Sequence, residues 1–335
     1  MKIKVACPLF LLLIVYGCTP VVIKPGPDVG HGYLTEHAFV TEDGVKLALR
    51  SWQANDIEAV LIALHGFNDY RNFFDKPGDY FARRNITSYA YDQRGFGESP
   101  KRGYWSGIET YCEDLATFVN LIKARHPDTP VYLLGESMGG AVIINTMTRS
   151  IKPRVNGIIL AAPAVWGRKT MPWYQTALLW SLSHSLPWLT LTGEDLEITP
   201  SDNIEMLKAL GQDPLVIKKT RVDAIYGLTN LMDQALDNAE LLNVDTLILY
   251  GEKDEIIPRQ PTYLFLRNLL SADPSDKTIA FYQDGYHMLL RDLQAPVLWR
   301  DIAAWIESST IPLPSGADKR AQQMLNINTL SLSSN

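Results

Sequence analysis

Cysteine is scarce in this sequence, and long runs of one charge are absent. The 335 residues include three cysteines, Cys7, Cys18 and Cys112, which are too few for a four-ligand metal site or a disulfide framework. The 31 lysines and arginines are outnumbered by 37 aspartates and glutamates, and the formal charge is -6. Without a basic run the chain is not expected to bind nucleic acid. The fold must therefore depend on packing, and we expect no metal or other cofactor.

The composition that remains is typical of a globular protein. Hydrophobic residues make up 46% of the chain and charged residues 20%, with 22 glycines and 20 prolines, which excludes a collagen-like or wholly disordered chain. A length of 335 residues lies within the range of one large α/β domain that carries an insertion. We therefore expect one elaborated core.

The N-terminus has the pattern of an export signal. Two lysines within Met1–Lys4 precede the uncharged stretch Val5–Tyr16. As a helix this stretch would span about 18 Å, short of the roughly 30 Å core of a bilayer. We therefore interpret residues 1–17 as a signal peptide and not as a membrane-spanning helix.

The residues around Cys18 suggest how the exported protein is held. Residues 15–18, Val-Tyr-Gly-Cys, resemble the lipobox of bacterial lipoproteins, although Tyr16 departs from the residue preferred there. The resemblance implies that Cys18 is lipidated and anchors an exported protein to a membrane, the outer one in a Gram-negative source because Thr19 is not aspartate. Ordinary signal-peptidase cleavage is the alternative. Residues 18–33, rich in proline and glycine, are predicted to form an extended tether.

From residue 34 onward the hydrophobic pattern alternates between strands and helices. Apolar runs of strand length, separated by helical periodicity, predict an α/β fold with a mostly parallel sheet covered on both faces. The strands are expected at 34–40, 45–52, 59–65, 86–92, 131–135, 157–161, 246–250 and 278–282, and the helices at 70–84, 108–125, 138–150, 261–270 and 295–306.

From residue 34 onward, the same pattern divides the chain into a core and two other parts. No comparable strand occurs between residues 164 and 243, so we predict a cap laid across the carboxyl ends of the strands. The core then comprises residues 34–163 and 244–310. Residues 311–335, rich in serine, asparagine and glutamine, are predicted to be a poorly ordered tail. Cys112 falls on an apolar helical face and is expected to be a buried, inert thiol.

The segment Gly135-Glu136-Ser137-Met138-Gly139 has the pattern of a catalytic nucleophile. It follows an apolar strand and precedes a helix, the context of the Gly-x-Ser-x-Gly elbow. The glycines are needed because a sharp turn from strand to helix leaves no room for neighbouring side chains. We therefore predict that Ser137 is lifted above the sheet as a nucleophile.

A serine nucleophile needs a base, and the base needs an orienting carboxylate. Of six histidines, His287 follows a predicted strand at the same sheet edge as Ser137. His65 is a competing candidate for the base. At a strand end and followed by Gly66, it is more simply explained as a residue that shapes this loop. Asp254, in the turn after the preceding strand, is preferred to Glu252 and Glu255 as the carboxylate. The order Ser137, Asp254, His287 is that of α/β-hydrolases.

Two backbone amides are candidates for an oxyanion hole, which stabilises the developing negative charge of the reaction. Met138 directly follows the nucleophile at a helix N-terminus, where the backbone dipoles favour negative charge. Phe67 lies in the loop after the third predicted strand, within His65-Gly66-Phe67-Asn68.

Five motifs in order resemble the monoacylglycerol lipase and lysophospholipase branch of the α/β-hydrolases over residues 34–308. They are His65-Gly66-Phe67, residues 92–99 (DQRGFGES), residues 135–140 (GESMGG), residues 251–254 (GEKD) and Tyr286-His287. The resemblance implies hydrolysis of a lipid or other amphipathic ester through an acyl-enzyme. It implies a structural role for residues 92–99, with Arg94 in an ion pair. Glu136 is similar to the form in plant monoacylglycerol lipases and caffeoylshikimate esterase, so a small or phenolic ester remains an alternative.

The predicted cap is rich in tryptophan. Residues 164–243 hold four of the eight tryptophans, Trp166, Trp173, Trp180 and Trp188. These side chains are candidates for substrate binding in an acyl tunnel, or for contact with a membrane, although packing of the cap is the simpler explanation for any one of them. Two other functions stay open: a peptidase or amidase with the same triad, and a catalytically silent surface binding module.

Overall fold

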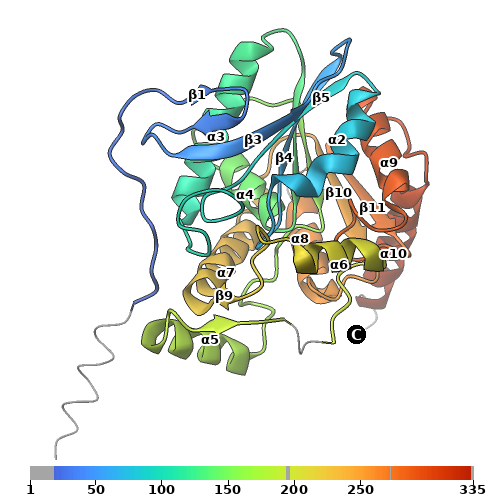
Figure 1. The fold of residues 1–335 in the computed structure, drawn as a ribbon. Coiled ribbons are helices and arrows are strands. Elements are labelled where there is room, and N and C mark those ends of the chain that lie inside the picture. Colours follow the sequence, from blue (N-terminus) through green and yellow to red (C-terminus); the bar gives the residue numbers. More distant parts are fainter. Residues whose placement is uncertain (1–18, 194–196, 272, 333–335) are drawn as a thin grey trace, which may run out of the picture.

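A nine-stranded sheet forms the centre of the protein in the computed structural model, which describes residues 19–193, 197–271 and 273–332 (Figure 1). The strands lie in the order β1-β2-β3-β5-β4-β6-β7-β10-β11. The first three strands and β5 pair antiparallel, and the pairs from β5 to β11 are parallel. The strands are β1 (Tyr33–Leu34), β2 (Ala38–Val40), β3 (Lys46–Trp52), β4 (Ala59–Leu64), β5 (Ile86–Tyr91), β6 (Val131–Glu136), β7 (Gly157–Ala161), β10 (Thr246–Gly251) and β11 (Lys277–Tyr282).

Helices cover both faces of this sheet. The helical elements of the described residues, those of the cap included, are η1 (Arg71–Phe74), α2 (Asp75–Ala82), α3 (Ile108–Arg125), α4 (Met138–Met147), α5 (Trp173–Ser185), α6 (Ile204–Gln212), α7 (Val222–Asp237), η2 (Ala239–Leu241), α8 (Arg259–Leu270), α9 (Ala295–Glu307) and α10 (Ala317–Leu332). The predicted α/β class is confirmed. The helix expected at 70–84 is instead a 3-10 turn followed by α2, because starting at Asp75 puts Pro77 in the first helical turn, where its missing N–H costs no hydrogen bond.

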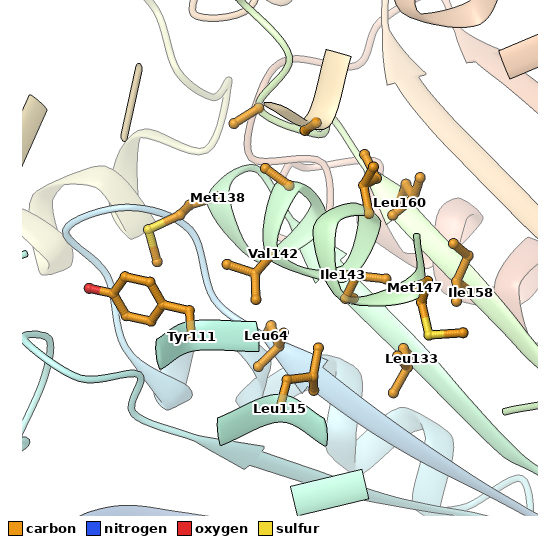
Figure 2. Packing of buried hydrophobic residues seen from close by; sticks show 14 of the residues in the cluster. Leu64, Tyr111, Leu115, Leu133, Met138, Val142, Ile143, Met147, Ile158 and Leu160 are labelled. Atoms are coloured by element: carbon orange, nitrogen blue, oxygen red, sulfur yellow. The ribbon is translucent and has the colours of Figure 1, made fainter. Parts of the chain in front are cut away.

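The helix that follows the candidate nucleophile lies in the middle of the core. All ten residues of α4 are buried. Figure 2 shows Met138, Val142 and Met147 of this helix packed among side chains of the sheet and of α3, which include Leu64, Leu133, Tyr111 and Leu115. A helix buried on every side cannot shift without disturbing both layers. The start of α4, where Ser137 lies, is therefore held firmly.

The predicted cap consists of two different parts. Helix α5 lies apart from the sheet, and the two-residue strands β8 (Thr190–Leu191) and β9 (Thr220–Arg221) pair with each other (Figure 1). Helix α6 lies closer to the sheet and faces the η1–α2 segment across a cavity. Helix α7, in contrast, packs against α4 and α8 and buries Leu231, Ala235 and Leu236 in the main core. The expectation that all of residues 164–243 lie across the strand ends is therefore wrong for α7. The reason is that burial of its apolar side chains in the main core stabilises this position.

The proline-rich segment predicted as an extended tether lies against the domain. Val21 N–H donates to Asp223 at the start of α7 over 3.4 Å, Ile23 N–H to the Trp105 carbonyl over 2.8 Å, and Val29 N–H to the Glu42 carbonyl over 2.8 Å. We call residues 19–32 the strap. Its prolines favour an extended chain, as the composition indicates, but the domain accepts hydrogen bonds from the backbone N–H groups of Val21, Ile23, Gly26 and Val29. In Figure 1 the strap runs from beside α5 to β1.

The C-terminal segment differs from the predicted disordered tail. Residues 317–332 form α10, which packs against β11, with Ala317 and Ala321 buried. Arg320 of this helix forms an ion pair with Glu252. Polar composition suggested disorder, but the small residues at the start of the helix allow it to approach the edge strand closely. Cys112, as expected, is buried in α3, and burial raises the pKa of its thiol.

Candidate active site

Ser137 occupies a sharp turn between β6 and α4. Its backbone has φ 53° and ψ -114°, an unfavourable conformation for a residue with a side chain. A Cβ atom on Gly135 would lie 2.4 Å from the backbone of Gly139, and one on Gly139 would lie 2.3 Å from the Leu64 carbonyl oxygen. Both glycines are therefore required by close packing. The turn holds the serine at the carboxyl edge of the sheet.

His287 and Asp254 are brought together from separate loops at this edge. The distance from His287 Nδ1 to Asp254 Oδ2 is 2.8 Å. Asp254 Oδ1 accepts the backbone N–H groups of Ile256 and Ile257, each over 2.9 Å, which fixes the carboxylate. With the proton on Nδ1, the other ring nitrogen of His287 is left to accept a proton from a nucleophile. The predicted pair thus has the geometry of a base and its orienting acid.

The other two carboxylates considered for this role have different partners. Glu252 forms an ion pair with Arg320, and Glu255 accepts the backbone N–H of Thr199 over 2.7 Å. No hydrogen bond joins Ser137 Oγ to His287 within the described ranges, which is common in sites without substrate. The roles of Ser137, Asp254 and His287 in catalysis remain predictions at this point.

The two amides predicted for the oxyanion hole lie near the nucleophile. A Cβ atom on Gly66, next to Phe67, would be 3.4 Å from Ser137 Cβ, so the loop after β4 lies against the turn. Neither Phe67 N–H nor Met138 N–H has a hydrogen-bond acceptor among the residues that the structure describes. Two backbone N–H groups without an acceptor beside one serine are suited to bind a negatively charged oxygen.

His65 has a structural role. Its Nδ1 lies 2.7 Å from the Gly66 carbonyl oxygen, and its Nε2 accepts the Gln93 backbone N–H over 3.0 Å. Burial lowers the pKa of this imidazole. Both ring nitrogens are occupied, so His65 shapes the loop that carries Phe67, as the sequence favoured. Arg94 is held between Asp43 and Asp114 at 2.7 Å each, which confirms the ion pair expected for the turn after β5.

The sequence analysis missed two buried charged residues of the site. Arg291, in the loop after His287, forms ion pairs with Asp69 and with Glu136, the residue before Ser137. No local pattern distinguishes Asp69 or Arg291 from surface residues. The only signal was their short distance in sequence from Phe67 and His287.

The tryptophans predicted to line an acyl tunnel lie mostly at the surface. Trp173, Trp180 and Trp188 are 81%, 53% and 56% exposed, whereas Trp166 is half-buried against the core. The first three are therefore not inside a tunnel. Helix α5 exposes Trp173, Tyr174, Leu178 and Trp180, and its single buried residue is Ser183, so the small cap does not cover these side chains.

A cavity of about 410 Å³ lies between α6 of the cap and the core, where the η1–α2 segment and the start of α9 line it. Apolar side chains contribute much of its wall: Phe73, Met206, Leu210, Leu293, Pro296 and Trp299. Asp69 and Arg291 also line it. Arg291, which lines the cavity, also forms an ion pair with Glu136, the residue that precedes Ser137.

This chain is similar in sequence to a known protein family and to lipases from other organisms. Residues 55–294 match the family model Hydrolase_4, described as serine aminopeptidase, S33. The chain is 26% identical to the monoacylglycerol lipase of Mycolicibacterium smegmatis over 280 residues, which cover 82% of this chain and 97% of that protein. It is 27% identical to the monoglyceride lipase of Rattus norvegicus, covering 76% and 84% of the two chains.

Solved structures agree in fold. The monoacylglycerol lipase of Paleococcus ferrophilus superposes with a TM-score of 0.66 at 24% identity, covering 78% of this chain and 98% of that one. A soluble variant of the monoglyceride lipase of Saccharomyces cerevisiae, in complex with a substrate analogue, superposes with a TM-score of 0.69 at 19% identity, covering 88% and 99%. At this level of identity the likeness concerns the fold.

Proposed function

Because this chain belongs to the serine aminopeptidase S33 (Hydrolase_4) family of α/β-hydrolases, we propose that it is a serine hydrolase that cleaves carboxylic esters of lipids. Ser137 would attack the ester carbonyl, His287 would take the serine proton and return it to the leaving alcohol, and Asp254 would orient His287. The N–H groups of Phe67 and Met138 would hold the oxyanion of each tetrahedral intermediate. Water would then release the acyl group from Ser137.

One observation carries this proposal: the His287–Asp254 hydrogen bond lies at the same sheet edge as the strained serine turn, with two unpaired amides beside it. Similarity to monoacylglycerol and monoglyceride lipases supports an ester of a single acyl chain as substrate. The family description favours a second candidate, an aminopeptidase, because the same triad cleaves amides.

Substrate class can be tested with a matched panel. We expect kcat/KM for p-nitrophenyl esters to rise from acetyl to medium acyl chains, with hydrolysis of monoacylglycerol and none of aminoacyl p-nitroanilides. Each CH₂ buried in an apolar site contributes about 0.8 kcal/mol before ordering costs are subtracted. Steady-state rates across the series provide the measurement. A maximum at acetate would favour the small-ester alternative, and faster cleavage of the anilides would favour the peptidase.

The 410 Å³ cavity beside α6 is the proposed acyl site, in place of the exposed tryptophans. Leu210→Trp places a larger side chain in its wall and should move the preferred acyl chain to a shorter length. Lys208→Trp adds the same side chain at an exposed position of α6, outside the cavity wall, and should leave the preference unchanged. Identical chain-length profiles for wild type and Leu210→Trp would mean that the acyl chain binds elsewhere.

We further propose that the protein is an exported lipoprotein anchored through Cys18. Cys18 lies outside the described residues, and no helix within them is long and apolar enough to cross a bilayer. The contact between Val21 and Asp223 fixes the strap at the start of α7, three residues from Cys18. Since α5 with its exposed tryptophans packs on α7, anchor and aromatic surface would lie on the same side of the molecule (Figure 1).

Fractionation tests the anchor. We expect full-length protein to remain with membranes after a high-salt wash and Cys18→Ser to move to the soluble or unprocessed fraction, because the acyl chains supply the attachment. Cys7→Ser changes a cysteine within the predicted signal peptide and should fractionate like wild type. If Cys18→Ser stays in the membrane fraction in processed form, the attachment does not depend on lipidation.

A further inference from the structure

A single arginine, Arg291, binds two buried carboxylates from other loops of the site. Its Nη2 lies 2.6 Å from Asp69 Oδ2 and 2.9 Å from Glu136 Oε2. The three side chains are 10%, 7% and 3% exposed, in the order Arg291, Asp69, Glu136. Breaking a buried pair by removing one partner leaves an uncompensated charge, which is costly. The contacts are therefore strongly specified by the surrounding structure.

Each member of this cluster is close in sequence to a group with a proposed role in catalysis. The neighbours are Ser137 for Glu136, Phe67 for Asp69, and His287 for Arg291. Arg291 N–H also donates to the Met288 carbonyl over 2.8 Å, which ties the arginine to the turn that carries the histidine. One guanidinium therefore connects the loops of the nucleophile, the oxyanion donor and the base.

The cluster carries more negative than positive charge. Two carboxylates share one guanidinium, and Glu136 Oε1 has no hydrogen-bond partner among the described side chains. Burial raises the pKa of Glu136, as does the charge of Asp69, whereas the positive charges of Arg291 and of protonated His287 oppose the rise. The charge of Glu136 in turn raises the pKa of His287.

Several charged groups face His287. Burial by itself lowers the pKa of this imidazole, but the surrounding carboxylates together outweigh burial and raise the pKa above the ordinary 6.5, with the charge and hydrogen bond of Asp254 the largest of their contributions. Glu136 and Asp292 add to the rise. Asp292 accepts a hydrogen bond from Ser201 of the cap and another from Tyr286 N–H, and burial raises its pKa to about 6. Among these carboxylates, Glu136 is the one that Arg291 contacts.

We propose that Arg291 is a positioning residue: by binding Glu136 and Asp69 it holds the three loops in register and prevents Glu136 from becoming the counter-ion of His287. This inference rests on the proposed serine-hydrolase function. Without the guanidinium, protonated His287 is the remaining nearby positive charge for Glu136. The imidazolium would then be stabilised, and less of the enzyme would hold the neutral base at a given pH.

The rate of Ser137 labelling by a fluorophosphonate, measured against pH, tests this directly. Labelling requires neutral His287 but no particular substrate, so the test stands even if the lipid-ester assignment fails. In Arg291→Met we expect the rate at neutral pH to fall at least about tenfold. We also expect the acid limb of the profile to move upward by about half a pH unit or more, since a raised pKa of the base delays its deprotonation.

Removing the second charge should reverse the shift. The double variant Arg291→Met/Glu136→Gln should have an acid limb at or below that of wild type, because the uncompensated carboxylate is gone. Glu136→Gln alone should move the limb downward, since Glu136 raises the pKa of His287. Arg149→Met, which breaks a partly exposed ion pair with Glu109 just beyond the C-terminal end of α4, should leave the profile unchanged.

The outcomes decide between positioning and simple structural support. A slower Arg291→Met with an unshifted acid limb, or a shift that Glu136→Gln does not reverse, would overturn the proposal. If Arg291→Met fails to fold, the Glu136→Gln profile decides by itself, and an unmoved limb contradicts the proposed coupling. Failure of wild type to react with the probe would instead refute the serine-hydrolase assignment.

Discussion

Replacing Ser137 with alanine should abolish ester hydrolysis and fluorophosphonate labelling together, with a loss of kcat of at least about 10⁴-fold. The hydroxyl forms the covalent bond to the acyl group, and no other group of the site can replace it. Fold and thermal stability should change little, because Ser137 is at the surface of the turn and its backbone contacts to Ala161 and Ala164 do not involve the side chain. Turnover, labelling and a thermal melt measure the three expectations.

A second serine provides the control for this prediction. Ser150 is exposed just beyond α4, so Ser150→Ala makes the same chemical change away from the site and should keep full activity and labelling. Retained hydrolysis in Ser137→Ala, with loss of hydrolysis in another serine variant, would show that the nucleophile has been misidentified.

Asp254→Asn should lower kcat by about 10⁴-fold, and His287→Ala by a similar factor. The 2.8 Å hydrogen bond requires an acceptor opposite Nδ1–H, and an asparagine amide can present a donor there and favour the wrong tautomer. Because the three residues act as one unit, the double variant should be no slower than about the slower single variant. Steady-state kinetics of the two single variants and the double variant measure this.

The neighbouring acid makes a sharp comparison. Glu255 is one residue from Asp254 but accepts a hydrogen bond from Thr199 in the cap and does not contact His287. Glu255→Gln should therefore keep most of the activity. A larger loss in Glu255→Gln than in Asp254→Asn, or strictly multiplicative losses in the double variant, would mean that the roles are wrongly assigned.

Local patterns accounted for most of the sheet and its helices. The strand over residues 157–161 and the helix over 108–125 were predicted with their observed bounds, because their apolar spacing is set by which side chains are buried. The serine turn was also predictable, since its glycines and its strand-turn-helix context are read within a few residues. For the same reason the sequence indicated a carboxylate after β10 and a histidine after β11.

The sequence was misleading where polarity or proline suggested that a segment has no partner. The strap and α10 have the composition of flexible ends, yet both pack on the domain through backbone hydrogen bonds and small side chains. Conversely, helix α5 has the apolar composition of a buried helix, but its tryptophans are exposed. Whether a segment is buried depends on which other parts of the folded chain it can pack against, and the composition of the segment does not contain that information.

By itself, the sequence determined the α/β class, the position of the serine turn and the residues that can form a base and its acid. Only the tertiary structure decided that Asp254, rather than Glu252 or Glu255, contacts His287, because this choice depends on loop geometry at the level of a single side chain. It also decided that Arg291 joins Asp69 and Glu136. These contacts connect residues 222 and 155 positions apart in the chain, and no local periodicity specifies a pair at such a separation.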